Sequence, residues 1–224
     1  MDHFVDAFLN ADIIYKTLPL LWRGFKITIL LSIIVVPTGM IGGLAVALMA
    51  SSSSSLVRIS SIVWTDLFRA LPPLVLLIFL YTGLPFAGWM ISPWAAVAIG
   101  FFMNTSAYYG EIFRSGIDSV ARGQTEAARS TGLSKAQAFR YVILPQAVRN
   151  VAPDLISNTL EIVKYTSLAS VVALEELLFQ ARQAQALTYN ASPIVAAALM
   201  YLIVLWPFVR LVSRLERKAI AHSR

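Results

Sequence analysis

The chain has 224 residues, of which 58% are apolar and only 13% are charged, and its formal net charge is +6. Soluble domains average about 45–50% apolar and about 25% charged residues, so this composition argues against a soluble enzyme and against a disordered chain. The composition favours an integral helical membrane protein, which we treat as one transmembrane domain, residues 1–224.

The cysteine and histidine content excludes several kinds of site. The chain has no cysteine, which excludes disulfides, a thiol nucleophile and thiolate-ligated metal centres. Its two histidines, His3 and His222, lie at opposite ends of the chain, so the sequence contains no cluster of histidines that would indicate a metal site or a catalytic triad. We therefore expect no metal site and no catalytic residue. Nucleic-acid binding is not expected either, because lysine and arginine in cytoplasmic loops explain the positive charge of a membrane protein.

Five apolar segments are predicted to cross a bilayer, which takes about 20 residues per helix. In chain order they are residues 27–50, 61–81, 94–113, 154–174 and 193–209. The serine run at residues 51–55 predicts a loop after the first span. The second and third spans are predicted to form a hairpin, because the uncharged stretch that contains them is too long for one helix and carries a cluster of glycines and prolines near its middle.

Two polar segments connect the later spans. In the longer one, residues 115–150, Gly132 is a terminator suited to the left-handed conformation, and Ser134 is a candidate N-cap for the next helix. We expect two short helices there, joined by a bend at Gly132, with Pro145 closing the second. The other segment, residues 175–191, is expected to be polar and to face water.

The distribution of lysine and arginine predicts the orientation in the membrane. Most of them lie near residue 58, in residues 115–150 and in the tail at residues 210–224. The positive-inside rule places these segments in the cytoplasm. The N-terminal segment, residues 1–23, then lies in the periplasm, and the basic tail is expected to contact lipid head groups.

The long cytoplasmic segment also carries a family resemblance. Its pattern is Glu-Ala-Ala, three residues, Gly, nine residues, and then a sequence ending in Leu-Pro, and it resembles the EAA loop of ABC importer permeases. The matching residues are Glu126, Ala127, Ala128, Gly132, Leu144 and Pro145, whereas Val142 replaces the isoleucine of the family pattern. Residues 69–72 and 164–168 are similar to segments of the polar amino acid branch, the histidine/glutamine/arginine-type permeases. The resemblance extends over about residues 18–218.

The resemblance implies a type I ABC importer permease with the all-α, MetI-like fold, in the bacterial inner membrane. In that family the EAA loop forms a coupling helix that docks onto a dimer of separate ABC ATPase subunits, which use ATP and Mg. This chain itself is expected to bind no cofactor and to be no enzyme, and it has no Gly-Lys pair for a phosphate-binding loop. The resemblance also implies a second permease, either a paralogue or another copy of this chain, and a periplasmic substrate-binding protein. The expected function is import of a polar amino acid or a related compound.

Candidate substrate residues come from charges inside the fourth predicted span. A charge at the centre of a span costs at least about 2.5 kcal/mol on insertion scales, which singles out Glu161 and Lys164. They either line the pathway and meet the ammonium and carboxylate of an amino acid, or neutralise each other as a structural pair. Asn158, Tyr165 and Ser167 supply nearby hydrogen-bonding groups. The family commonly has an acid where this chain has Tyr165, which argues against a site tuned to cationic amino acids, although Glu161 could partly replace that charge.

Asp66 and Arg69 form a second pair of charges at i,i+3 spacing, near the cytoplasmic end of the second span. They are interpreted either as part of a gate or as an ion pair that fixes the depth of the helix. The alternative function for the whole chain is a self-sufficient secondary transporter or channel. Such a protein would need its own ion relay, and the chain shows no internal repeat of the kind common in secondary transporters.

Overall fold

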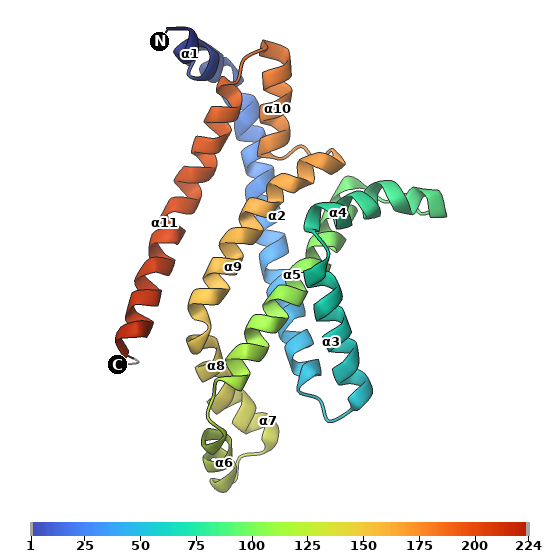
Figure 1. Cartoon of the computed structure of the whole chain (residues 1–224), viewed down its shortest axis with the longest axis vertical. Helices are drawn as coiled ribbons and strands as arrows, with labels where there is room; N and C mark the ends of the chain where they lie inside the picture. Colours follow the sequence, from blue (N-terminus) through green and yellow to red (C-terminus); the bar gives the residue numbers. More distant parts are fainter. Residues whose placement is uncertain (1, 223–224) are drawn as a thin grey trace.

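A computed structural model describes the backbone of residues 2–222 and the side chains of residues 3–214 (Figure 1). The fold is helical, and no strand occurs within these residues. The α-helices are α1 (Asp2–Phe8), α2 (Ala11–Ala50), α3 (Ser55–Ala70), α4 (Pro73–Ile78), α5 (Pro93–Asp118), α6 (Arg122–Ser130), α7 (Lys135–Ala138), α8 (Leu144–Asn150), α9 (Ala152–Tyr165), α10 (Leu177–Thr188) and α11 (Ser192–His222). Helical turns of 3₁₀ or π type are η1 (Phe79–Gly83), η2 (Leu84–Ala87), η3 (Phe139–Ile143) and η4 (Thr166–Val172). The predicted all-α fold class is confirmed.

The long helix α2 runs through the molecule from the end that holds α1 and α10 toward the end that holds α6 and α7 (Figure 1). Its 40 residues rise about 60 Å at 1.5 Å per residue. Asn10 caps the helix, because its side-chain oxygen accepts a hydrogen bond from Ile13 N at 3.1 Å. The helix includes the whole first predicted span and also begins well before it, so most of the predicted N-terminal segment is helical.

The largest core cluster lies where α2 packs against α5, and glycines let the two backbones approach closely. A Cβ atom added at Gly43 would lie only 2.8 Å from the backbone nitrogen of Gly110. Close contact of this kind through small residues is typical of helix pairs in membranes. On α5, the side chain of Tyr109 is fully buried and its hydroxyl hydrogen-bonds Thr159 of α9 at 2.6 Å. Helix α5 therefore joins α2 to α9.

The second predicted span is broken, so the prediction of one continuous helix at residues 61–81 is wrong. Helix α3 ends at Ala70, the backbone of Leu71 after it is extended, and α4 begins at Pro73 after a bend of 98°. The cause is the pair Pro72 and Pro73: the residue before a proline avoids the α conformation, and a proline lacks the N–H that a helix interior needs. The predicted turn before the third span is confirmed by Gly88, which has a φ of +83°.

The fourth predicted span, residues 154–174, is not one α-helix either. Helix α9 ends at Tyr165, and the chain continues as the tighter 3₁₀ segment η4 until Ala173, which has a φ of +59°. At 1.5 Å per residue, the 14 residues of α9 rise only about 21 Å, so α9 alone is shorter than the bilayer core.

The prediction that residues 175–191 form a polar segment facing water holds for only one face of the segment, where Arg182, Gln183 and Gln185 are exposed. Residues 175–191 contain α10, whose other face packs against α2 and α11 and buries Leu177, Gln180 and Ala181. A close approach to α2 makes this burial possible, because a Cβ at Gly24 would lie 2.8 Å from the carbonyl oxygen of Glu176. The segment is part of the helical bundle.

Not all of the five predicted spans are single helices that are long and apolar enough to cross a membrane. Within the described residues, His3–Ala50 and Ser192–Arg214 are long and apolar enough, and the bent pair α3–α4 makes a third span if it is counted as one. The third predicted span lies in α5 and the fourth in α9 with η4, and these helices do not combine the same length with the same apolar composition. The predicted tail at residues 210–224 continues α11 to His222, and its remaining two residues lie outside the described part of the chain.

Candidate functional site

The segment that resembles the EAA loop lies at one end of the molecule, opposite α1 and α10 (Figure 1). In α6 the side chains of Glu126 and Ala127 are exposed, whereas Ala128 is buried and anchors the helix. Gly132 has a φ of +89° and follows the end of α6, which confirms the predicted left-handed bend. Ser134 then caps α7 in a reciprocal capping box, which confirms the predicted second helix start.

Pro145 does not close the second helix, and that prediction is wrong. The chain continues from α7 through the π-type turns of η3 into α8, where Pro145 occupies the first turn. A proline is tolerated there because the hydrogen-bond pattern changes from π to α at this point: the N–H of Leu144 bonds the carbonyl oxygen of Phe139, and Pro145 has no N–H that needs a partner. Leu144 lies beside it and is half-buried. The result is a continuous helical strut that returns the chain from α7 to the bundle, and α8 packs against α5.

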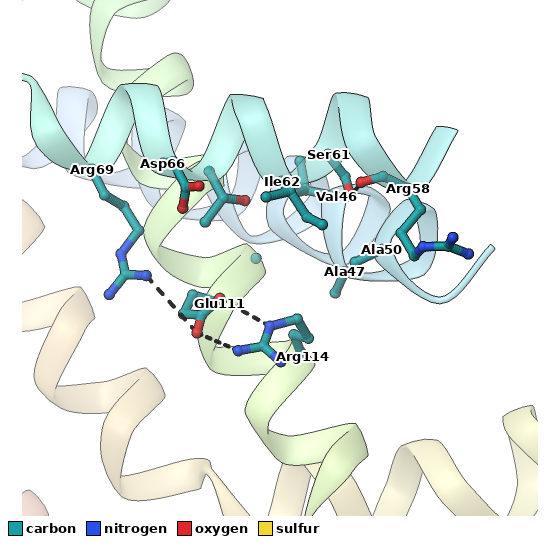
Figure 2. Close-up of a pocket in the computed structure, with 12 residues that line it drawn as sticks. Val46, Ala47, Ala50, Arg58, Ser61, Ile62, Asp66, Arg69, Glu111 and Arg114 are labelled. Carbon is teal, nitrogen blue, oxygen red and sulfur yellow. Dashed lines mark hydrogen bonds and ion pairs between the residues drawn. The ribbon is translucent and has the colours of Figure 1, made fainter. Parts of the chain in front are cut away.

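A second cluster of polar residues surrounds a cavity of about 380 Å³ between α2, α3 and α5 (Figure 2). Helix α3 contributes Arg58, Asp66 and Arg69, which lie along one of its faces, and α5 contributes Glu111 and Arg114. The wall formed by α2 is apolar and built of Val46, Ala47 and Ala50. The cavity lies at the same end of the molecule as the loop between α2 and α3.

The ion pair predicted between Asp66 and Arg69 is not formed. Arg69 Nη1 lies 3.9 Å from Glu111 Oε1 instead (Figure 2). Its guanidinium also lies over the ring of Tyr108, 5.6 Å from the ring centroid. Glu111 is bound mainly by Arg114, with hydrogen bonds of 2.6 and 3.0 Å to its two oxygens. Spacing along α3 could not reveal this arrangement, because α5 supplies the partner.

Arg114 itself joins two carboxylates on α5. It hydrogen-bonds Glu111 three residues before it and, at 2.9 Å, Asp118 four residues after it. Sequence reasoning missed this role, although the i,i+3 and i,i+4 spacings were a usable signal. The pairs stabilise the last turns of α5 directly before the segment that contains α6.

The predicted substrate candidates lie on α9 and η4. Glu161 and Lys164 form an ion pair with each other, and about half of each side chain is exposed, 50% and 48%. Asn158 Nδ2 is buried without a hydrogen-bond partner among the described residues. Tyr165 packs against the main core cluster, and the hydroxyl of Ser167 bonds the carbonyl of Lys164 at 2.7 Å. The two charges therefore share a surface of α9, whereas Tyr165 and Ser167 are engaged within the fold.

Glu176 is a buried acid that sequence reasoning assigned to a water-facing segment. Its carboxylate accepts hydrogen bonds from the N–H groups of Leu178 and Phe179, and so caps α10. The hydroxyl of Tyr201 on α11 donates a third bond of 2.9 Å. Thr28 of α2 accepts the N–H of Leu177 at 3.1 Å. These bonds hold α2, α10 and α11 together.

Comparison with known proteins identifies the family. The sequence pattern of the family described as "Binding-protein-dependent transport system inner membrane component" matches residues 39–221. The probable glutamine ABC transporter permease protein GlnM of Bacillus subtilis (strain 168) is 33% identical over 211 residues, which cover 94% of this chain and 98% of GlnM. A solved structure described as an amino acid ABC transporter with histidines superposes with a TM-score of 0.83 at 35% identity, over 92% of this chain and 96% of that one.

A chain of the MetNI methionine ABC transporter in an inward-facing conformation superposes with a TM-score of 0.74, over 89% of this chain and 96% of that one. At 18% identity this likeness shows the fold alone. The chain belongs to the family of inner-membrane components of binding-protein-dependent transport systems, and it is an ABC importer permease with the MetI-like fold.

Proposed function

We propose that this chain forms part of the membrane pathway of an importer for a polar amino acid, and that a separate ABC ATPase drives it through α6 and α7. The observation that carries the proposal is the exposed helix pair at the end of the bundle, in a chain of this family. The glutamine permease GlnM and the amino acid transporter structure support the substrate class.

The packing of the α6–α7 helix pair suits it to transmit a movement of a bound partner protein to the helical bundle. Helix α6 is exposed except for Ala128, so a partner protein can cover it without first displacing other parts of the chain. Behind it, α8 packs against α5, and Asn150 Nδ2 bonds the hydroxyl of Ser119 at 2.8 Å. A displacement of α6 would therefore reach α5, and through the bond between Tyr109 and Thr159 it would reach α9.

The assembly proposed is that of the family. Two ATPase subunits bind ATP and Mg on the cytoplasmic side, a second permease completes the pathway, and a periplasmic protein delivers the amino acid. The N-terminus lies in the periplasm and the C-terminus in the cytoplasm, with the basic tail against lipid head groups. On α9, the pair Glu161 and Lys164 faces the pathway, with Asn158 beside it. Family membership disfavours the alternative of a self-sufficient transporter or channel.

The test is uptake of labelled L-glutamine into proteoliposomes that contain the complete complex, with ATP inside or outside. The variant combines Glu126→Ala with Gly132→Ala, and Gly88→Ala is the matched control, since both glycines have a positive φ and open space around an added Cβ, but Gly88 lies between η2 and α5, outside α6 and α7. Coupling predicts ATP-dependent uptake that the double variant abolishes and the control retains.

Two results would contradict the proposal. Normal coupled uptake by the double variant would mean that α6 and α7 do not carry the coupling. Uptake that proceeds without ATP or the ATPase and collapses with an uncoupler would instead identify a secondary transporter.

A further inference from the structure

The cavity between α2, α3 and α5 has a charge arrangement that the helix contacts alone do not explain. It brings together three arginines and two acids, and one wall is apolar (Figure 2). Polar groups beside an apolar wall are typical of small-ligand sites, and its volume of about 380 Å³ lies in the lower part of the range for such pockets.

Two of the charges remain available to a ligand. Asp66 has no ion-pair partner in the part of the chain that the structure describes. Arg69 is only loosely held, because its contact to Glu111 is 3.9 Å long and Arg114 already engages both oxygens of that carboxylate. A guanidinium carries five N–H donors, so Arg69 can still bind a carboxylate with two parallel hydrogen bonds.

The remaining arginines are already engaged. Arg58 donates to the carbonyl oxygen of Ser52 at 3.2 Å and to the hydroxyl of Ser55 at 3.3 Å, which fixes it at the loop end of the cavity. Arg114 is held by two acids of its own helix. The available groups are therefore one cation and one anion, at i,i+3 positions of α3, where neighbouring side chains are about 5–6 Å apart.

We propose that this cavity binds the zwitterionic head of an α-amino acid, with Arg69 on the carboxylate and Asp66 on the ammonium. An α-amino acid carries these two opposite charges on neighbouring groups, which matches one available cation and one available anion on adjacent turns. A simple anion would pair with Arg69 but leave the carboxylate of Asp66 without a partner. A simple cation would pair with Asp66 but leave Arg69 without a partner.

The proposal rests on the proposed function, since it gives the transported class of compound a second place of contact, separate from Glu161 and Lys164 on α9. The cavity is lined by the C-terminal turns of α5, the helix that leads into the α6–α7 pair. It is thus a site that an amino acid occupies on the coupling side of the bundle.

The experiment measures equilibrium binding of labelled L-glutamine to the complete complex in nanodiscs, without nucleotide and without the binding protein. Two competitors each lack one charge: the des-amino analogue has no ammonium, and the α-carboxamide has no carboxylate. The variants are Asp66→Asn and Arg69→Gln. Asp12→Asn and Arg182→Gln are matched controls, because they remove the same charges from exposed positions outside the cavity.

We expect the wild-type complex to prefer L-glutamine over each competitor by about tenfold or more, the usual effect of one charge-assisted hydrogen bond. Asp66→Asn should weaken the binding of L-glutamine about tenfold. It should abolish the preference for L-glutamine over the des-amino analogue but keep the preference over the α-carboxamide. Arg69→Gln should also weaken the binding of L-glutamine, and it should abolish only the preference over the α-carboxamide. The two control variants should bind all three compounds as the wild type does.

Three results would overturn the site. One is the absence of L-glutamine binding to the wild-type complex, and another is des-amino analogue binding as tightly as L-glutamine. The third is discrimination that survives Asp66→Asn and Arg69→Gln but is lost in Glu161→Gln and Lys164→Gln, which would place the head group on α9. ATP-driven uptake is measured in parallel: uptake that continues while the site fails would leave the proposed function standing, and wild-type complex without ATP-driven uptake would refute the function itself.

Discussion

The contact between α2 and α5 allows a sharp prediction about Gly43. A Cβ atom at this position would collide with Tyr109 Cβ, and would lie 2.8 Å from Gly110 N and 2.9 Å from the carbonyl carbon of Tyr109. Two of these three atoms belong to the backbone of α5 and cannot rotate away. Carbon atoms pack best at about 3.5–4.0 Å, so Gly43→Ala would force the two helices apart by about 1 Å.

The expected cost follows from overpacking, which destabilises by about 1–3 kcal/mol and sometimes more. The higher helix propensity of alanine offsets at most about 1 kcal/mol. Because the clash involves backbone of the main core contact, we expect a net loss of about 2 kcal/mol. For a chain of this length that corresponds to a melting temperature about 4–8 °C lower. Gly42→Ala is the matched control: its Cβ would meet the ring of Phe102 at 2.7 Å, and a half-exposed ring can turn aside.

The assay is the thermal unfolding of the purified complex, followed by the fluorescence of the five tryptophans of the chain. Gly43→Ala should melt clearly below wild type and Gly42→Ala should lie between the two. If the two variants lowered the melting temperature equally, or if Gly43→Ala melted like wild type, the backbone contact would not limit the packing of α2 on α5.

Three further predictions concern local structure. Gly132→Ala should destabilise the α6–α7 bend by about 1–2 kcal/mol, because a residue with a Cβ is strained at a φ of +89°. Amide hydrogen exchange at the bend should be faster in this variant but not in Gly123→Ala, and equal exchange in the two variants would refute the prediction. Ser134→Ala should cost α7 about 1 kcal/mol of cap energy, measured by the same exchange, and unchanged protection of Gln137 N would contradict it. Tyr201→Phe should lower the melting temperature by about 2–4 °C, because Glu176 loses one buried hydrogen bond, and an unchanged melting curve would show that bond to be dispensable.

The positions of several helices could be predicted from the sequence because absence of charge is a local property. Residues 27–50 lie within α2, residues 94–113 within α5 and residues 193–209 within α11. Runs without charge locate apolar helices whatever their neighbours are. The bend of the α6–α7 pair was equally accessible, since Gly132 and Ser134 act through their own backbone and nearest neighbours.

The features that could not be predicted depend on a partner far along the chain. The 98° bend between α3 and α4 is the exception: its cause, Pro72 and Pro73, is local, but hydropathy stays high across the two prolines, so a search for apolar runs passes over it. The burial of Glu176 depends on Gly24, about 150 residues earlier, where the missing side chain leaves room for the start of α10. A charged residue beside a polar segment predicts exposure unless that distant contact is known.

The pairing of Arg69 shows the same limit and bears on function. Spacing along α3 favours Asp66 as its partner, but α5 places Glu111 within 3.9 Å and leaves Asp66 available. Because Arg114 ties Glu111 to Asp118 at the end of α5, a ligand that drew Arg69 away from Glu111 would loosen α3 from the helix that leads to the coupling segment. From Glu111 to Asp118 the helix rises only about 10 Å. One short helical segment thus lines the cavity at one end and leads into α6 at the other, which gives occupancy of the cavity a physical route to the segment on which the ATPase would act.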